Sequence, residues 1–478
     1  MRRDAVTSPV GNQALYAFDD NGNVTTVTER AFDTSTATTT DFITRYAYDE
    51  LDRVISIGND DGDGVATDAN TTMYAYDSLD ELVEEEDARS NITRNAYDAL
   101  GRLDSTTHDP GGIAALIDYD YDANDRLITM TDPNTNDTSY SYDKFNRLTR
   151  TDYANGLTEI FRYDAVDNVT EHLAPGGLAT STVYDGRGRP TAQTYSQLGG
   201  RENPGQTSYQ YDALGRVTEV RNDATTVSRS YDTLSLPTSE TIQPVAMPGT
   251  TLRRTYNSKG QLASIDPPGA VNSNRFDYAR NADGLATGVT RNSKQLAKFD
   301  YLGPRPNLRT LRTGTSLVGT TTVGYEETGL RPDSIDHEDD TNATVDTRVY
   351  TWDDAYNLDD YQITGGALSA TSVNWNYDAL NRLDPASIGA GWTLDDIGNR
   401  TGAGYSFTGN DELMHRYTLV NSLPHFYDPQ GALLAVGVDA SSLYFYNYDA
   451  NDRLDSFRDI TFSANTSFGT LDVNDGDW

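Results

Sequence analysis

The sequence contains no cysteine and only five histidines in 478 residues. Disulfide bonds, thiol catalysis and zinc–thiolate centres are therefore excluded. The histidines share no spacing typical of a metal site or a proton relay, so each is interpreted as incidental: His108, His172, His337, His415 and His425.

Positive charge is also scarce, because 37 Lys and Arg residues face 73 Asp and Glu residues and the formal net charge is −36. Such an acidic chain is not expected to bind nucleic acid. No apolar run approaches the roughly 18 residues that a membrane-spanning helix needs. The start of the chain has two arginines, Arg2 and Arg3, but no apolar segment behind them, so no signal peptide is recognised.

The choice of charged residues indicates strands and turns rather than helices. Aspartate outnumbers glutamate 58 to 15, and arginine outnumbers lysine 33 to 4. Aspartate disfavours helix interiors and favours turns, where its carboxylate accepts hydrogen bonds from nearby backbone N–H groups. The 31 tyrosines are typical of strands. We therefore expect an all-β protein with many turns.

An aromatic residue followed by an acid recurs along the chain. From Tyr48 the steps between successive units are 28, 21, 24, 21, 21, 21, 27 and 20 residues, ending at Tyr231. Less regular units follow, and residues 291–346 hold degenerate repeats. About twenty units cover residues 1–478, which predicts a single array rather than separate globular domains.

Each clear unit has the sequence of a β-hairpin. In Tyr97–Leu103, Asp98 can open a type I turn, Gly101 can take a left-handed conformation, and Leu103 begins the return strand. Gly, Asn and Asp tolerate positive φ best. They fill the slot of Gly101 in most units: Gly22, Asp52, Asp80, Asp125, Asn146, Asp167, Gly188, Gly215, Gly260, Gly329, Asn381, Gly398, Gly431 and Asp452.

Twenty hairpins imply on the order of 40 strands, and open sheets seldom exceed about ten strands without curling. The predicted fold is therefore a long antiparallel β-hairpin ribbon that winds into a spiral hollow shell or tube. A mean hydropathy of −0.63 argues against a thick core. Tyrosines that recur at one place in each hairpin are expected to stack in cross-strand ladders.

The repeating units resemble the YD repeats of the RHS superfamily, which includes bacterial RHS toxins, the C component of Tc toxin complexes and the teneurins. The resemblance is carried by segments such as Tyr142–Thr149 and Tyr211–Thr218. It implies a hairpin strip that spirals into a hollow shell, which in the toxins encloses a C-terminal effector. RHS toxins continue with a segment of the form DPxGLxxxRxYDPxxGRF. The nearest string here, Tyr427–Leu433, lacks its second half, so we expect no C-terminal core-associated or effector domain. The chain is then either an excerpt of a longer protein, which the absence of a signal peptide and of capping units favours, or one of the repeat-only members.

The expected function is a non-catalytic structural scaffold, a shell or filament for display or adhesion, at an extracellular or cell-surface location that the resemblance implies. One alternative is a toxin-encapsulating shell fragment, with an enclosed effector only if a C-terminal region is missing. Another is a carbohydrate-binding module, and the array could also self-associate. The aromatic residues that could stack on glycans are Trp352, Trp375 and Trp392.

Two charged segments have alternative interpretations. The basic stretch 291–312 could face an acidic neighbour or a polyanion, but ion pairs within a strand are the simpler interpretation. The run Glu84–Asp87 is expected to be a solvated turn.

The long step after Tyr48 contains a candidate calcium loop. Asn59, Asp61 and Asp63 alternate and Gly64 follows, the arrangement that points oxygens inward in EF-hand-like loops. The twelfth position is Asn70 instead of a bidentate glutamate, so an ordinary acidic hairpin tip remains the alternative. The string 472–477 is similar but truncated.

Calcium should raise the melting temperature more than magnesium does at matched ionic strength. Binding to the folded state alone stabilises it by about 2.7 kcal/mol at a hundred times the dissociation constant. The double variant Asp61→Ala/Asp63→Ala should lose the difference in a thermal melt. Equal responses to the two cations in the unmutated protein would leave only screening of the net charge.

Overall fold

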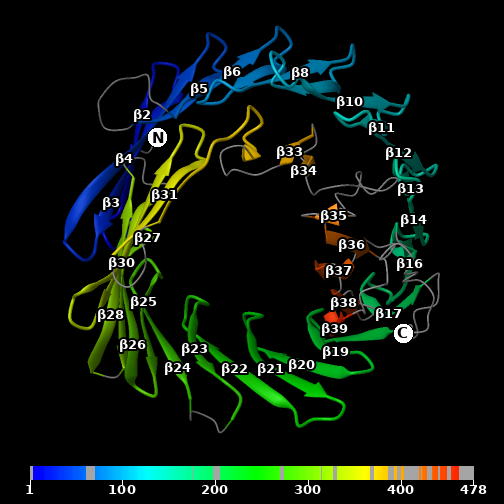
Figure 1. The fold of residues 1–478 in the computed structure, drawn as a ribbon. Coiled ribbons are helices and arrows are strands. Elements are labelled where there is room, and N and C mark those ends of the chain that lie inside the picture. The colour runs from blue at the N-terminus through cyan, green and yellow to red at the C-terminus, as the bar shows by residue number, and fades with distance from the viewer. Residues whose placement is uncertain are drawn as a thin grey trace. The chain divides into compact units, whose positions relative to one another are not determined.

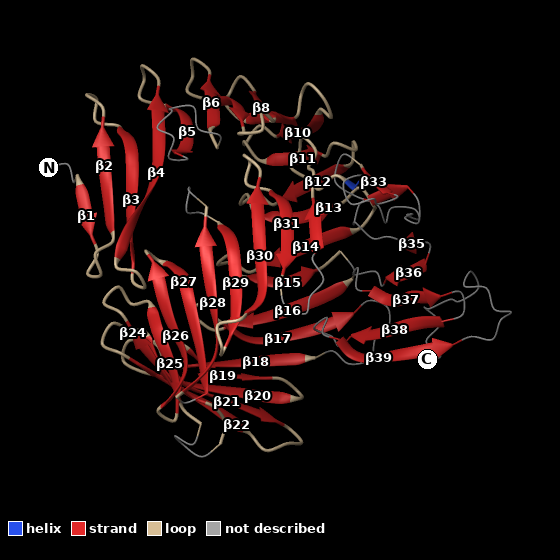
Figure 2. Cartoon of the chain, turned by 60° about the vertical axis from the view of Figure 1, so that its left-hand side comes forward, coloured by secondary structure: helices blue, strands red, loops and turns tan. Residues whose placement is uncertain are grey.

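The computed structural model describes residues 4–60, 70–175, 177–197, 205–269, 274–313, 315–326, 331–365, 371–385, 392–395 and 400–402, together with the backbone of the strands between 419 and 461. These residues form strands joined by turns, and no α-helix occurs among them (Figure 2). No helix in this part of the chain has the length and apolar character needed to span a membrane. The predicted all-β class is confirmed.

The strands are mostly five to ten residues long and follow one another along the chain (Figure 1). The first group is β1 (Ala5–Thr7), β2 (Gln13–Phe18), β3 (Val24–Asp33), β4 (Thr38–Tyr48), β5 (Val54–Asp60), β6 (Thr72–Tyr76), β7 (Leu82–Glu86), β8 (Ile92–Tyr97), β9 (Leu103–His108), β10 (Ala115–Tyr121), β11 (Leu127–Thr131), β12 (Asp137–Tyr142) and β13 (Leu148–Asp152). The second group is β14 (Thr158–Tyr163), β15 (Val169–Leu173), β16 (Leu178–Tyr184), β17 (Pro190–Gln197), β18 (Gln206–Tyr211), β19 (Val217–Arg221), β20 (Thr225–Tyr231), β21 (Pro237–Pro244), β22 (Thr250–Tyr256), β23 (Leu262–Asp266), β24 (Phe276–Arg280), β25 (Ala286–Arg291) and β26 (Lys294–Leu302). The third group is β27 (Arg305–Thr313), β28 (Ser316–Tyr325), β29 (Pro332–Asp339), β30 (Thr344–Trp352), β31 (Leu358–Thr364), β32 (Thr371–Asn374), β33 (Trp392–Leu394), β34 (Arg400–Gly402), β35 (Leu419–Val420), β36 (Leu423–Tyr427), β37 (Leu433–Asp439), β38 (Ser442–Tyr448) and β39 (Leu454–Thr461).

Consecutive strands pair in antiparallel register, as a hairpin ribbon requires. Strand β12 pairs with β13 so that Tyr142 lies opposite Leu148, and a register shift separates Ser141 from Tyr142. The same shift before the aromatic residue recurs in the neighbouring hairpins β10–β11 and β14–β15. The spacing of six residues from aromatic to apolar residue is therefore the register of a bulged hairpin.

The chain divides into two compact units. The first contains Met1–Arg102, Thr107–Ala114 and Ser228–Ile388, and the second contains Leu103–Thr106, Ala115–Val227 and Gly389–Trp478. YD hairpins form both units, so the repeat sets the local structure in each.

The turn after Tyr142 shows the predicted geometry. The Asp143 N–H donates to the carbonyl of Arg147 over 3.0 Å, and the Asn146 N–H donates to the carbonyl of Asp143 over 3.1 Å. The Asp143 carboxylate accepts from the N–H groups of Phe145 and Arg147. Asn146 has φ 65°. The described residues of the predicted slot all have positive φ: Gly22, Asp52, Asp80, Gly101, Asp125, Asn146, Asp167, Gly188, Gly215, Gly260 and Asn381. Gly329, Gly398, Gly431 and Asp452 lie outside the described residues.

The opposite ends of several hairpins use the same turn, which the sequence analysis missed. The N–H of Asp132 donates to the carbonyl of Asn136, and the N–H of Thr135 donates back to the carbonyl of Asp132. Thr135 has φ 63° although it is β-branched. An aspartate at the first position therefore stabilises the turn even where the positive-φ position holds neither glycine nor asparagine.

In most of the described units a tyrosine is bound to the preceding hairpin through its hydroxyl group. The Tyr163 hydroxyl donates to the carbonyl of Leu148, the return residue of the previous unit, over 2.7 Å. The same bond recurs along both units: Tyr48 to Val24, Tyr97 to Leu82, Tyr121 to Leu103, Tyr142 to Leu127, Tyr184 to Val169, Tyr211 to Pro190, Tyr256 to Pro237, Tyr301 to Ala286, Tyr325 to Pro306 and Tyr377 to Leu358.

In several hairpins the arginine that ends the turn links its own unit to the next one, as Arg53, Arg126 and Arg147 do. Arg147 pairs with Asp143 of its own turn over 2.7 Å. It also donates to the Asp164 carbonyl and the Asp167 carboxylate of the following turn, over 2.9 and 2.8 Å. Its guanidinium lies 4.6 Å from the centre of the Tyr163 ring. The expected tyrosine-on-tyrosine ladder is wrong for these units, because the arginine covers the ring face where a second tyrosine would stack.

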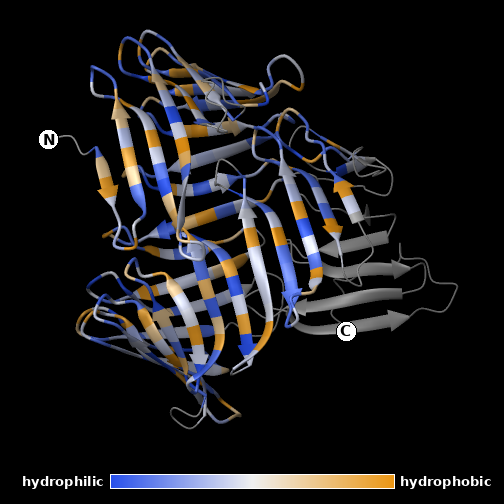
Figure 3. Ribbon diagram, turned by 90° about the vertical axis from the view of Figure 1, so that its left-hand side faces the viewer, coloured by the Kyte–Doolittle hydropathy of each residue, from blue (hydrophilic) through white to orange (hydrophobic). Residues whose placement is uncertain are grey.

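Apolar burial is small. The apolar residues that are almost fully buried are few among the described residues: Ala31, Phe42, Ala115, Ala297 and Tyr301. Along many strands polar and apolar residues alternate (Figure 3), and most side chains on both faces are only half-buried. Hydrogen bonds and arginine contacts between hairpins therefore carry much of the specificity that a thick core would supply in a globular domain.

The run Glu84–Asp87 is not a solvated turn, as predicted, because its first three residues belong to β7. Glu84 lies opposite Arg94 of β8 and pairs with it over 2.7 Å. Only Asp87 opens a turn, whose last residue is Asn91. The cross-strand cation makes consecutive glutamates acceptable in a strand.

Candidate functional site

Within the first unit, strands far apart in the sequence come together. Strand β3 pairs with β26 through Asp33 and Leu302 (Figure 1). Around this bridge the Thr34 N–H donates to the Tyr301 carbonyl over 2.8 Å, and the Tyr301 N–H donates to the Thr34 hydroxyl over 2.8 Å. The ribbon of this unit therefore meets itself about 270 residues later.

A half-buried ion pair and a close backbone approach stabilise this contact. Both guanidinium NH groups of Arg305 bind the Glu29 carboxylate, over 2.7 and 3.0 Å. The same guanidinium lies 4.7 Å from the centre of the buried Phe42 ring. Gly303 has φ 60°, and a Cβ there would come within 3.0 Å of the Ala31 Cβ. Glycine and alanine at these two positions permit the approach.

A second long-range contact joins two turns of the first unit, 87–91 and 378–382, and we call it the turn seam. Arg89 donates to the Asn381 side-chain oxygen over 2.9 Å and to the Tyr377 carbonyl over 2.8 Å. Asn381 in turn donates to Asp87 over 2.9 Å. Arg89 also pairs with Asp353 over 3.4 Å. Arg89 thus binds the left-handed residue of a distant turn, as Arg147 does for the next turn.

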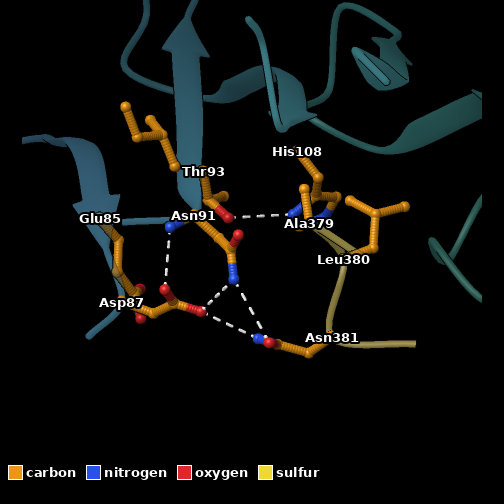
Figure 4. A pocket seen from close by; sticks show the side chains of 9 residues that line it. Glu85, Asp87, Asn91, Thr93, His108, Ala379, Leu380 and Asn381 are labelled. Carbon is orange, nitrogen blue, oxygen red and sulfur yellow. Dashed lines mark hydrogen bonds between the residues drawn. The ribbon is translucent and has the colours of Figure 1, made fainter. Parts of the chain in front are cut away.

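A pocket of about 280 Å³ lies at the turn seam (Figure 4). Strands β7 to β9 and the turn 87–91 supply one side, and the turn 378–382 supplies the other. Its lining residues are Glu85, Asp87, Asn91, Ile92, Thr93, His108, Ala379, Leu380 and Asn381. The pocket exists only where two segments about 290 residues apart are in contact.

The electrostatics of the pocket are dominated by carboxylates. Burial raises the pKa of Asp87, but hydrogen bonds from Asn381, Asn91 and the backbone outweigh burial and hold this pKa below its usual value. Asp87 is therefore ionised at neutral pH, and Glu85 adds a second carboxylate.

The candidate calcium ligands are only partly described. Asn59 lies in β5, where its side chain accepts from the Thr44 hydroxyl over 2.9 Å and donates to the Tyr356 hydroxyl. Asp61 and Asp63 lie outside the described residues, as does the string 472–477. Among the residues that the structure describes, no three acidic or histidine side chains gather in a way that could hold a metal ion. The calcium loop remains a prediction.

Two of the three tryptophans proposed to stack on sugars are engaged within the sheet. Trp352 takes the place of tyrosine in the hairpin, because its indole N–H donates to the Pro332 carbonyl over 2.9 Å. Trp375 stacks on Tyr361, with 6.4 Å between ring centres. The side chain of Trp392 lies outside the described residues. Glycan binding also remains a prediction.

The described histidines and the basic stretch make contacts across strands. His172 bonds Glu159 over 2.6 Å, and His337 bonds the Thr321 hydroxyl over 3.0 Å. The side chains of His415 and His425 lie outside the described residues. In the basic stretch, Lys298 pairs with Asp300 over 2.8 Å. Arg305 instead pairs with Glu29, 276 residues away in the sequence, so an ion pair within a strand accounts for Lys298 but not for Arg305.

The residues of the turn seam were missed in the sequence. Arg89 occupies the third position of the turn, whereas the arginines that link neighbouring units occupy the fifth. The signal in the sequence was an arginine at the third turn position instead of the fifth. It could not have revealed which distant turn accepts it.

Replacing Arg89 should open the turn seam. Arg89→Met keeps the aliphatic stem but removes the charged hydrogen bonds, which are worth roughly 1–3 kcal/mol. Hydrogen exchange should then become faster in 87–91 and 377–382. Arg187→Met is the matched control, because Arg187 has the same turn position but makes a single long contact with the Ala213 carbonyl. Unchanged exchange at both segments in Arg89→Met would contradict the role of Arg89.

Comparison with known proteins identifies the repeat. Residues 121–158 and 163–197 match the family described as RHS Repeat. Double-stranded DNA deaminase toxin A of Burkholderia cenocepacia (strain H111) is 25% identical over 191 residues, which is 40% of this chain and 11% of the toxin. The chain therefore spans only about a tenth of the curated relative that it matches.

Two solved structures share the fold. The Tc holotoxin pore of Photorhabdus luminescens, determined with a mutated TccC3, matches with a TM-score of 0.65 and 12% identity, over 96% of this chain and 30% of that one. The TcdB2–TccC3 structure without its hypervariable C-terminal region matches with a TM-score of 0.66, 12% identity and the same shares. The YD hairpins, the RHS-repeat match over residues 121–158 and 163–197 and this shared fold together support an RHS/YD-repeat protein.

Proposed function

We propose that this chain is part of the wall of an RHS-type shell that encloses an effector polypeptide, and that the wall itself is not catalytic. The observation that carries the proposal is the contact of the ribbon with itself in the first unit. A ribbon that meets itself after about 270 residues, through the Asp33–Leu302 bridge and Arg305, is suited to bounding a space.

The low burial of side chains on both faces of the sheet supports a single-layer wall rather than a domain with a filled core. Most side chains on both faces are half-buried, and the almost fully buried apolar residues are few among those described. A sheet of this kind separates two polar surroundings, which a shell requires. The hydrogen bonds of Tyr163 and Arg147 stabilise it without a second layer.

The comparisons support an effector-enclosing role over a free scaffold. A curated relative is named a toxin, and both structural neighbours belong to Tc toxins. This chain spans 30% of each neighbour, so an effector would lie in sequence outside these 478 residues. An extracellular site of action belongs to the same proposal. The adhesion scaffold and the glycan-binding module are the alternatives that the experiment must distinguish.

The test is protease protection in the protein expressed from its complete open reading frame. The effector region encoded outside residues 1–478 should survive proteinase K while the array is folded. The same region expressed separately is the control and should be digested under identical conditions. Equal digestion of the two forms would contradict enclosure, as would an open reading frame with no effector region, and either result would favour the scaffold.

A further inference from the structure

We propose that the pocket at the turn seam binds the cationic end of a basic side chain, an ammonium or guanidinium group on an aliphatic stem. This binding site goes beyond the proposed function and does not depend on it. The inference rests on which polar groups of the pocket are already engaged, which are unengaged, and what the remaining wall is made of.

Glu85 supplies a carboxylate that no other described side chain binds. It lies in β7 opposite Tyr74 of β6 and Thr93 of β8, and neither residue carries positive charge at neutral pH. By contrast its neighbour Glu84 is paired with Arg94. Alternation along the strand places these two glutamates on opposite faces. Only Glu85 faces the pocket.

His108 supplies a second acceptor. Its Nδ1 lies 3.0 Å from the Thr93 hydroxyl, which can accept the Nδ1 proton and leave Nε2 with a lone pair. Figure 4 shows Thr93 and His108 joined in this way beside Leu380. Glu85 and His108 lie on opposite sides of Asn91 in Figure 4, so the charged acceptor for a cationic group is Glu85, and His108 offers a polar group at the other side of the pocket.

Asp87 contributes charge but no vacant acceptor position. One carboxylate oxygen accepts from the N–H groups of Arg89 and Asn91, and the other accepts from the side chains of Asn91 and Asn381. The two carboxylates of the lining favour a cation over an anion, and the Arg89 guanidinium beside Asn381 is paired with Asp353. One unengaged carboxylate and one imidazole are too few ligands for a calcium or zinc site. An organic cation needs no more than these.

The rest of the wall is apolar and fits the stem of such a side chain. Ile92, Ala379 and Leu380 line it. Leu380 occupies a turn position where leucines elsewhere are exposed: Leu79 is 74% exposed, and Leu100 is 73% exposed. At the seam Leu380 is instead half-buried. Lysine and arginine bury their methylene groups against such surfaces while the charged end finds a polar partner.

Binding should also stabilise the turn seam. Both segments of the seam line the pocket, so a ligand that needs both binds only when they are in contact. Mass action then favours the closed seam by RT ln(1 + [L]/Kd). A basic side chain would act as a clamp between segments that Arg89 already joins.

The experiment uses the 478-residue chain and three probes: the N-acetyl methylamides of lysine, arginine and citrulline. Citrulline is the neutral counterpart of arginine. Calorimetry should detect the two cationic probes, and either should slow hydrogen exchange in 87–91 and 377–382. Glu85→Gln should weaken binding up to about fivefold, since Glu85 is exposed and an exposed ion pair is worth at most roughly 1 kcal/mol. Glu84→Gln, the matched control on the opposite face, should bind as the unmutated chain does.

Three results would overturn the inference: no binding of either cationic probe, equal binding of citrulline, or equal binding by Glu85→Gln. Since these measurements use no effector, their failure is distinct from failure of the protease-protection test.

A second experiment shows whether the bound cation belongs to the enclosed polypeptide or to a free amine. In the protein from the complete open reading frame, a photo-crosslinking residue at Leu380 should capture the enclosed polypeptide if that is the source. Binding of putrescine without such a crosslink would assign the pocket to free amines.

Discussion

One guanidinium bridging two consecutive turns is the interaction on which the array depends. Arg147 closes its own turn through Asp143, reaches the next turn at Asp164 and Asp167, and covers the ring of Tyr163. Arg126 makes the equivalent contacts with the turn of Asp143. Where this bridge is present, a hairpin is positioned by the one before it. The turn after Tyr163 ends in Asn168 instead, and there the Tyr184 hydroxyl bond to the Val169 carbonyl makes the link.

This constraint explains the composition. A planar guanidinium can serve two carboxylates and a ring at once, whereas an ammonium group cannot, which accounts for 33 arginines and 4 lysines. Aspartate is short enough to accept N–H groups of its own turn and still pair with the arginine. Hydrogen bonds from the Arg189 side chain and from the Arg189 and Arg187 N–H groups lower the pKa of Asp185 to about 2. Such aspartates remain charged at neutral pH.

Local structure could be predicted from the sequence, because everything within one hairpin repeats. The left-handed conformation of Gly101 and Asn146 and the pairing of Tyr142 with Leu148 follow from spacing and residue type alone. The turn seam could not be predicted. Which turn meets Arg89 depends on how many strands separate the two segments and on the twist of each pair. Neither quantity is encoded in the 21-residue period, so the pocket beside Arg89 was invisible to pattern analysis.

The most direct test of the arginine bridge is hydrogen exchange in Arg147→Met compared with Arg150→Met. Arg150 is an exposed residue of β13, and its guanidinium pairs with Asp152 over 2.6 Å and donates to the Thr158 hydroxyl, both outside the turn after Tyr163. If each arginine positions the next hairpin, Arg147→Met should speed exchange in the following turn, 164–168, and leave the preceding turn, 122–126, close to its original rate. Arg150→Met should change neither turn. Equal exchange at 164–168 in both variants would contradict the account.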